Sequence, residues 1–188
     1  MKNFSIRGGI LALVGVGGAL GITLLITALL SLQGFRDDVH QVAAQLARSS
    51  QALAEVSAAQ NAFQRQQRGL NAMMLRSFMS SEFDKGRAEF TAGRQQFLSA
   101  IDELEALHRA GLQNAGRIDE LRPLAESLNQ LYDEVLASNE PGEPKYIQMV
   151  DAGVRDADAP LIAALAETFA SISAASSDSA GIAAQLAD

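Results

Sequence analysis

The chain has 188 residues, 48% hydrophobic but only 5% aromatic, with no cysteine and a formal net charge of −7. The absence of cysteine excludes a disulfide framework, a thiolate zinc site and a thiol nucleophile. The negative charge argues against sequence-independent binding to nucleic acid, which needs a cationic surface to displace counterions. A composition rich in Ala and Leu is typical of helices, because these side chains lose little entropy there.

An uncharged segment near the N-terminus is the strongest signal in the sequence. Between Arg7 and Arg36 it reads GGILALVGVGGALGITLLITALLSLQGF. As a helix rising about 1.5 Å per residue, it exceeds the roughly 30 Å of a bilayer core. The alternative is a cleaved signal peptide, whose apolar run is usually about 7–15 residues and ends in small residues. Because this run is longer and Leu30–Gln33 has no such ending, the sequence predicts a retained transmembrane helix over residues 8–34.

The charges on the two sides of this span predict its orientation. Lys2 and Arg7 precede it, whereas two acidic residues follow Arg36. Positively charged flanks stay in the cytoplasm. We therefore expect residues 1–7 to be cytoplasmic and residues 35–188 to lie on the outer side of the membrane.

A heptad pattern follows the span and predicts a long first helix over residues 35–79. The pattern has a 3.5-residue period and contains no proline. Its seam consists of Val39, Val42, Leu46, Ser49, Leu53, Val56, Gln60, Phe63, Gln67, Leu70 and Met74. Because the pattern starts where the span ends, we expect the membrane helix to continue into it. Two copies of a tethered helix readily share such a seam, so we also expect a homodimer.

Two shorter helices are predicted over residues 82–110 and 116–138. The segment FMSSEFDKG, with serine ahead of acidic residues, is typical of a helix start. The apolar face of the first of these helices consists of Phe83, Phe90, Phe97, Ile101, Leu104 and Leu107. The core positions of the second are Ile118, Leu121, Ala125, Leu128, Tyr132 and Val135.

A last helix is predicted over residues 144–188, after the turn signal SNEPGEP. Pro160 predicts a break near residue 160. No segment alternates with a period of two, so we expect no sheet. Four helices with short connections predict an all-α fold, a membrane-anchored, antiparallel up-down four-helix bundle.

This layout resembles the four-helix-bundle sensor domain of methyl-accepting chemotaxis proteins. Three segments carry the resemblance over essentially the whole chain: MKNFSIRGG at the start, AFQRQQRGLNAMMLRS over residues 62–77 and VDAGVRDADAPLIAAL over residues 150–165. Position 70 departs from the family, since relatives often carry a large aromatic residue where this chain has Leu70.

The resemblance implies the sensory portion of a bacterial transmembrane chemoreceptor, with its span in the inner membrane and its bundle in the periplasm. Such a protein binds a small anionic ligand or a periplasmic binding protein and passes the stimulus to a cytoplasmic signalling domain. Because the chain stops at Asp188, about where a second span would begin, we expect it to be part of a longer receptor. A stand-alone anchored bundle is the alternative.

Polar residues of the first helix are the candidate ligand site. Asn61, Arg65 and Arg68 share one face at positions i, i+4 and i+7, with Arg76 two turns further on. The planar fork of arginine suits a carboxylate, and the resembled sensor domains bind ligands through helix arginines near a subunit interface. The alternative is a solvated face, or ion pairs with acidic residues of the next helix, Glu82, Glu89 and Glu103.

Two glutamines occupy seam positions of the same helix, where apolar residues are usual. A buried amide must find hydrogen-bond partners. Gln60 and Gln67 are therefore expected either to line a small pocket or to set the register between two first helices.

No catalytic constellation is visible, since the sequence has no Ser/His/Asp set, glycine-rich phosphate loop or paired-carboxylate cleft. The two histidines are too few and too distant for a metal site, and the acidic run Asp151–Asp158 with Arg155 is expected to be solvated. We expect no enzyme, metal or cofactor. Two functions besides chemoreception stay open: a sensor of a histidine kinase or cyclic-dinucleotide enzyme, and a non-signalling anchored helical assembly protein.

Overall fold

The computed structural model describes the backbone of residues 6–112 and 115–187, and the side chains of residues 39–112 and 115–184. Within these ranges the chain forms five helices and no strand, which confirms the prediction of an all-helical protein. The helices are α1 (Ile6–Leu75), α2 (Ser80–Arg109), α3 (Ile118–Ser138), α4 (Tyr146–Val154) and α5 (Ala159–Ala187).

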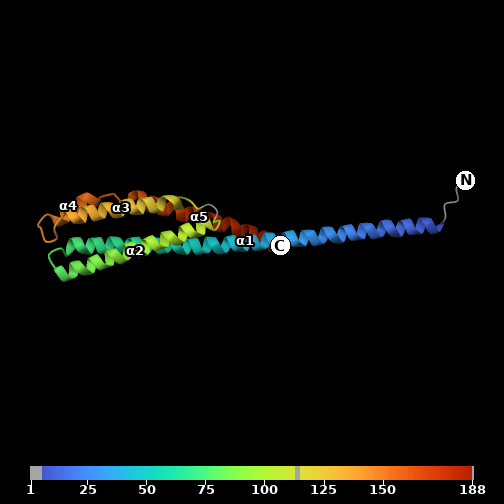
Figure 1. Ribbon diagram of the computed structural model, residues 1–188, viewed down its shortest axis with the longest axis horizontal. Coiled ribbons are helices and arrows are strands. Elements are labelled where there is room, and N and C mark those ends of the chain that lie inside the picture. Colours follow the sequence, from blue (N-terminus) through green and yellow to red (C-terminus); the bar gives the residue numbers. More distant parts are fainter. Residues whose placement is uncertain (1–5, 113–114, 188) are drawn as a thin grey trace.

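The first helix is one uninterrupted element of 70 residues. It crosses the predicted boundary at residue 35 without a break, and its N-terminal half projects beyond the other helices (Figure 1). It ends at Leu75, four residues before the predicted end, where the Met79 amide donates to the carbonyl of Arg76 at 2.9 Å. The side chains of the predicted span, residues 8–34, lie outside the described residues, so the span stays a prediction.

The second helix runs back along α1, and glycines let the two backbones approach closely (Figure 1). A Cβ atom added to any of three glycines would press on backbone atoms of the opposite helix: Gly69 (2.6 Å from Phe90 Cα), Gly86 (2.9 Å from Met73 N) and Gly93 (2.7 Å from Gln66 Cα). These three facing pairs therefore set the register of the hairpin.

The close approach corrects the seam that the heptad pattern predicted. Val39 is 40% exposed, and Gln60 and Gln67 are only half-buried. The neighbouring line, Ala52, Ala59, Gln66 and Met73, is buried in their place, beside Val56, Phe63 and Leu70 of the predicted seam. Of this line, Gln66 and Met73 lie against Gly93 and Gly86 of α2. The reason is that α1 contacts helices on two sides, α2 on one and α5 on the other.

Aromatic residues fill the core between helices. Three pairs each join two elements: Phe63–Phe97 (ring centroids 5.5 Å apart), Phe90–Tyr132 (5.6 Å) and Phe83–Tyr146 (6.3 Å). Such offset and edge-on pairs contribute beyond the area they bury. They tie α2 to α1, to α3 and to the start of α4.

The last predicted helix is divided in two. The break lies between Val154 and Ala159, where Asp156 adopts a left-handed φ of 59°. Pro160 lies in the first turn of α5. Backbone N–H groups in the first turn have no acceptor within the helix, so a proline there costs no hydrogen bond. The predicted break near residue 160 is thus observed as a short, irregular segment.

Among the residues that the structure describes, α5 contains one stretch long and apolar enough to cross a membrane. This stretch is Ala159–Ala184, with a mean hydropathy of 1.3 and 33% of its most apolar window buried. A core helix of a bundle meets the same criteria.

Candidate functional site

The four predicted ligand residues of α1 do not converge. Arg65 is half-buried and donates from Nη1 to Oε1 of Gln96 on α2, at 3.2 Å. Arg76 forms an ion pair with Glu82 at 2.7 Å, one of the pairings that the sequence left open. Asn61 and Arg68 are exposed.

Glu82 lies between two cations at the start of α2. A hydrogen bond and the charge of Lys85, and then the charge of Arg76, hold the pKa of Glu82 below its ordinary value. Both partners of the Arg76–Glu82 pair are partly exposed, so the pair contributes little to stability.

The two predicted seam glutamines lie together beside α5. Gln60 and Gln67 line a cavity of about 410 Å³ whose opposite wall consists of Ile162, Leu165 and Ala166 of α5. Of the two roles expected for them, this placement fits a pocket wall. The other role, register between two first helices, stays a prediction.

Gln67 also makes a contact to the break between α4 and α5. Its Nε2 donates to Oδ2 of Asp158. Asp158 is half-buried, so the expectation that its acidic run is wholly solvated is wrong at this residue. The buried side chain of Tyr132 on α3 lies beside both: burial first, and then the charge of Asp158, raises the pKa of Tyr132 to about 12. A polar contact therefore joins α1, α3 and the break.

A second polar pair, formed by Gln66 next to Gln67, lies inside the core. Nε2 of Gln66 donates to Oδ1 of Asn129 at 2.8 Å, and both side chains are buried. Arg94 of α2 extends the pair: its guanidinium donates to the Asn129 carbonyl at 3.3 Å and binds both carboxylate oxygens of Asp133, at 2.8 and 3.0 Å. We call these residues the polar layer: Gln66, Gln67, Arg94, Asn129, Tyr132, Asp133 and Asp158.

The sequence predicted Gln67 as a polar seam residue and Tyr132 as a core position, but not the polar layer that they form with the other residues. Gln66 lies seven residues after Ala59 and seven before Met73. That spacing is a seam signal of its own, which would have identified Gln66 had two seams been considered. Nothing local in the sequence connects Asn129 or Asp158 to α1.

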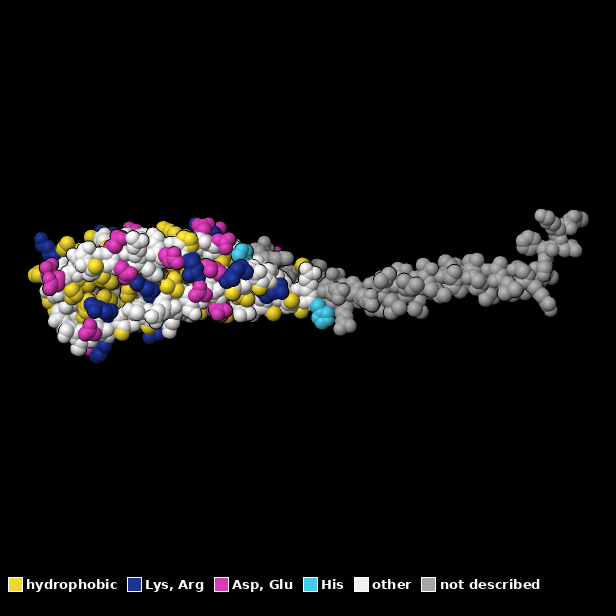
Figure 2. All heavy atoms as spheres, viewed as in Figure 1, with side chains coloured by type: hydrophobic (Ala, Val, Ile, Leu, Met, Phe, Trp, Pro, Cys, Tyr) yellow, Lys and Arg dark blue, Asp and Glu magenta, His cyan; other side chains and the backbone are white. Residues whose placement is uncertain are grey.

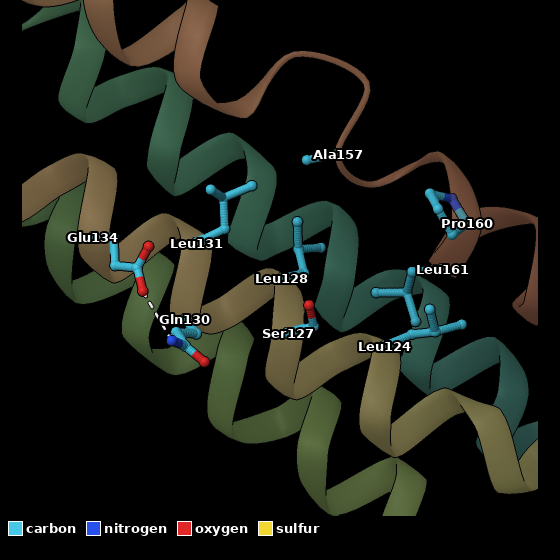
Figure 3. A pocket seen from close by; sticks show the side chains of 9 residues that line it. All are labelled: Leu124, Ser127, Leu128, Gln130, Leu131, Glu134, Ala157, Pro160 and Leu161. Carbon is cyan, nitrogen blue, oxygen red and sulfur yellow. Dashed lines mark hydrogen bonds between the residues drawn. The ribbon is translucent and has the colours of Figure 1, made fainter.

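An open cavity of about 380 Å³ lies beside the break. Figure 3 shows Leu124, Leu128 and Leu131 of α3 facing Ala157, Pro160 and Leu161. At one end Nε2 of Gln130 donates to Oε1 of Glu134 at 2.8 Å, and the hydroxyl-bearing Ser127 of α3 also lines the cavity (Figure 3). The cavity therefore has both apolar and polar parts in its wall.

No group of three or more His, Asp or Glu side chains is placed for a metal ion in the part of the chain whose side chains are described. The expectation that the protein has no metal site stays a prediction. No protein family, curated protein or solved structure matches the chain.

The two tyrosines of the chain, Tyr132 and Tyr146, allow a test of the polar layer by pH. Burial raises the pKa of both, that of Tyr132 to about 12. Above pH ~10 the unfolded chain loses these protons first, so the stability present below pH ~10 should fall by roughly 1.4 kcal/mol per pH unit for each tyrosine, up to its folded pKa. Denaturant melts across this range measure the fall.

Two further measurements accompany the denaturant melts. Tyr132→Phe should flatten the alkaline slope, because one of the two groups that cause it is removed. The ultraviolet absorbance of the folded protein should show no phenolate with a midpoint near 10. Such a midpoint would contradict the burial of these hydroxyls.

Proposed function

We propose that this chain is the sensory part of a bacterial membrane receptor of the chemoreceptor type. In this proposal residues 8–34 cross the inner membrane, and residues 35–188 form a periplasmic up-down four-helix bundle. The fourth helix of that bundle is α4 and α5 together. The protein is not an enzyme, and a homodimer is its working form.

The observation that carries the proposal is the continuity of α1. The same helix that contains the uncharged segment also supplies Gln66 and Gln67 to the polar layer. A helix transmits a small displacement along its axis because its backbone hydrogen bonds resist compression. A change of packing in the bundle therefore has a direct path to the membrane.

In this proposal α1 has two packings against the bundle, and the polar layer is where they differ. Its hydrogen bonds join α1 to α3 and to the α4–α5 break. A hydrogen-bonded side chain changes its partner in a discrete step, whereas apolar side chains shift past each other gradually. A ligand drives the change only if it binds one packing more tightly than the other.

The packing of α5 supports its assignment to the bundle and not to the membrane. Leu161, Leu165 and Ile172 are buried against the other helices. Glu167 lies 3.6 Å from Arg117, a charged contact that favours water over lipid.

The output of the receptor is open in this proposal. The same bundle would serve a histidine kinase or a cyclic-dinucleotide enzyme. A non-signalling anchored assembly protein is the other alternative, and it would need no movement in the polar layer.

The anchor is tested by fractionation of the full chain expressed in bacteria. It should remain with inner membranes after carbonate extraction, because an apolar helix of this length leaves the bilayer only at high cost. Protease added to spheroplasts should digest the bundle. Recovery of a soluble periplasmic protein shortened by about 30 residues would identify a cleaved signal peptide.

Sensing is tested by joining residues 1–188 to the second membrane span and the cytoplasmic signalling half of a characterised chemoreceptor. A compound from a library of amino acids and organic acids should change the output of this fusion. The matched control carries Gln67→Ala, which removes the contact to Asp158 and should weaken the response without removing the protein from the membrane. An anchored fusion that responds to no compound would favour the assembly protein.

A further inference from the structure

A third cavity lies at the end of the molecule where α1 turns into α2 and α3 turns into α4 (Figure 1). It has a volume of about 340 Å³ and opens between α2 and the α3–α4 segment. Apolar side chains from four elements line it: Met73, Phe83, Phe90, Leu136, Pro141 and Tyr146. Figure 2 shows hydrophobic side chains gathered near this end, with Lys or Arg side chains at their edge.

Hydrogen-bond donors converge on this cavity from one face of α2. Arg87, Thr91 and Arg94 line it at positions i, i+4 and i+7. The two guanidinium groups stack over the apolar wall, Arg87 at 5.0 Å from the Phe83 ring and Arg94 at 4.9 Å from the Phe90 ring. Stacking holds each planar fork in place. The edge of the Arg94 fork is bound by Asp133 and the Asn129 carbonyl, whereas that of Arg87 has no partner among the described residues.

The donors at this cavity outnumber the acceptors. Among the described residues, no carboxylate forms an ion pair with Arg87, and the single acidic side chain lining the cavity, Asp133, is already bound by Arg94. The Tyr146 hydroxyl and the Nε of Arg94 are buried, and neither has a partner among the described residues. A buried polar group without a partner is costly, and a bound anion would satisfy it.

We propose that this cavity binds a small carboxylate with an apolar body, the carboxylate on Arg87 and the Tyr146 hydroxyl and the apolar body against Phe83, Phe90 and Pro141. Guanidinium and phenol together form the charge-assisted bonds that a carboxylate prefers. The charge of Arg87 acts on the Tyr146 hydroxyl, lowering its pKa against the rise that burial causes. Both side chains line the same cavity, where one anion would meet them together.

Binding at this cavity needs neither the anchor nor signalling. Its link to α1 does rest on the proposed function. Arg94 lines the cavity and also donates to Asn129, the partner of Gln66 on α1. A ligand that contacts Arg94 would thus affect the polar layer through this one side chain.

The test uses the full chain in detergent micelles and phenylacetate as the probe. Calorimetric titration should show saturable binding, and the ligand should raise the melting temperature by mass action. Acetate, which lacks the apolar body, and phenylacetamide, which lacks the charge, should each bind at least ten-fold more weakly. Equal binding of phenylacetamide would overturn the carboxylate assignment.

Variants then locate the site. Arg87→Gln should weaken phenylacetate binding roughly ten- to a hundred-fold, the usual effect of losing a charged hydrogen bond, and Arg87→Lys should recover part of it. Tyr146→Phe should also weaken binding while leaving the unliganded melt unchanged or slightly higher, since its hydroxyl has no partner to lose.

The matched controls are Arg65→Gln and Arg68→Gln on the α1 face. Both should bind phenylacetate as the parent does. Loss of binding in these variants with full binding in Arg87→Gln would overturn the proposal and move the ligand to α1. Absence of phenylacetate binding at millimolar concentration would overturn it as well. A soluble product in the fractionation test would refute the anchor and leave this result standing.

Discussion

Replacing Gly93 by alanine should destabilise the protein by about 1–3 kcal/mol, although the same change in most helices is stabilising. The added Cβ atom would lie 2.7 Å from the Cα atom of Gln66 and 2.9 Å from the carbonyl oxygen of Ala62. These are backbone atoms, so no side-chain rotation relieves the contact. Helices α1 and α2 must move apart, which opens the core between Phe63 and Phe97. Denaturant unfolding followed by circular dichroism measures the loss.

The matched control for this change is Gly181→Ala on α5. A Cβ atom there would meet nothing within 4 Å. Only the entropy of the unfolded chain changes, so Gly181→Ala should raise the stability by roughly 0.5–1 kcal/mol. Gly69→Ala should repeat the effect of Gly93→Ala, since its Cβ would lie 2.6 Å from the Cα atom of Phe90. Stabilisation by both changes would refute the close approach of α1 and α2.

Replacing either partner of the Gln66–Asn129 pair by leucine should destabilise the protein by about 1–3 kcal/mol, whereas replacing both should cost much less. The two amides are buried and joined at 2.8 Å. Each single change leaves the other amide without a partner inside the core. The double change removes both polar groups and replaces them with apolar side chains of similar size. A double-mutant cycle on unfolding free energies therefore should give a large favourable coupling.

The control for this cycle is Gln130→Leu, which removes an exposed amide from the same helix. Gln130 donates to Glu134 at the surface, where water replaces the lost bond. Its stability should change by less than about 0.5 kcal/mol. Additive single changes at Gln66 and Asn129 would mean that the two amides do not depend on each other.

The sequence by itself determined the helices and the faces of two of them. All six apolar positions predicted for α2 are buried, and so are five of the six predicted for α3, with Val135 half-buried. Each of these faces is a local property: a period of 3.6 residues decides which side chains leave water, whatever helix covers them. Pro160 likewise acts on its own turn, so the break beside it was predictable.

Only the tertiary structure decided which line of α1 is buried and what its polar residues bind. A helix that contacts neighbours on two sides has more than one apolar stripe. The heptad pattern selected the line of Gln60 and Gln67. In the structure the close approach at the glycines of α2 buries the line of Gln66 instead. The contacts of Gln66 to Asn129 and of Gln67 to Asp158 span 63 and 91 residues of sequence. Arg87 and Tyr146, the two donors of the proposed carboxylate site, likewise come from helices distant in sequence, α2 and α4. Such pairings depend on how helices distant in sequence approach each other, and that distance of approach is a property of the packed chain and not of any one segment.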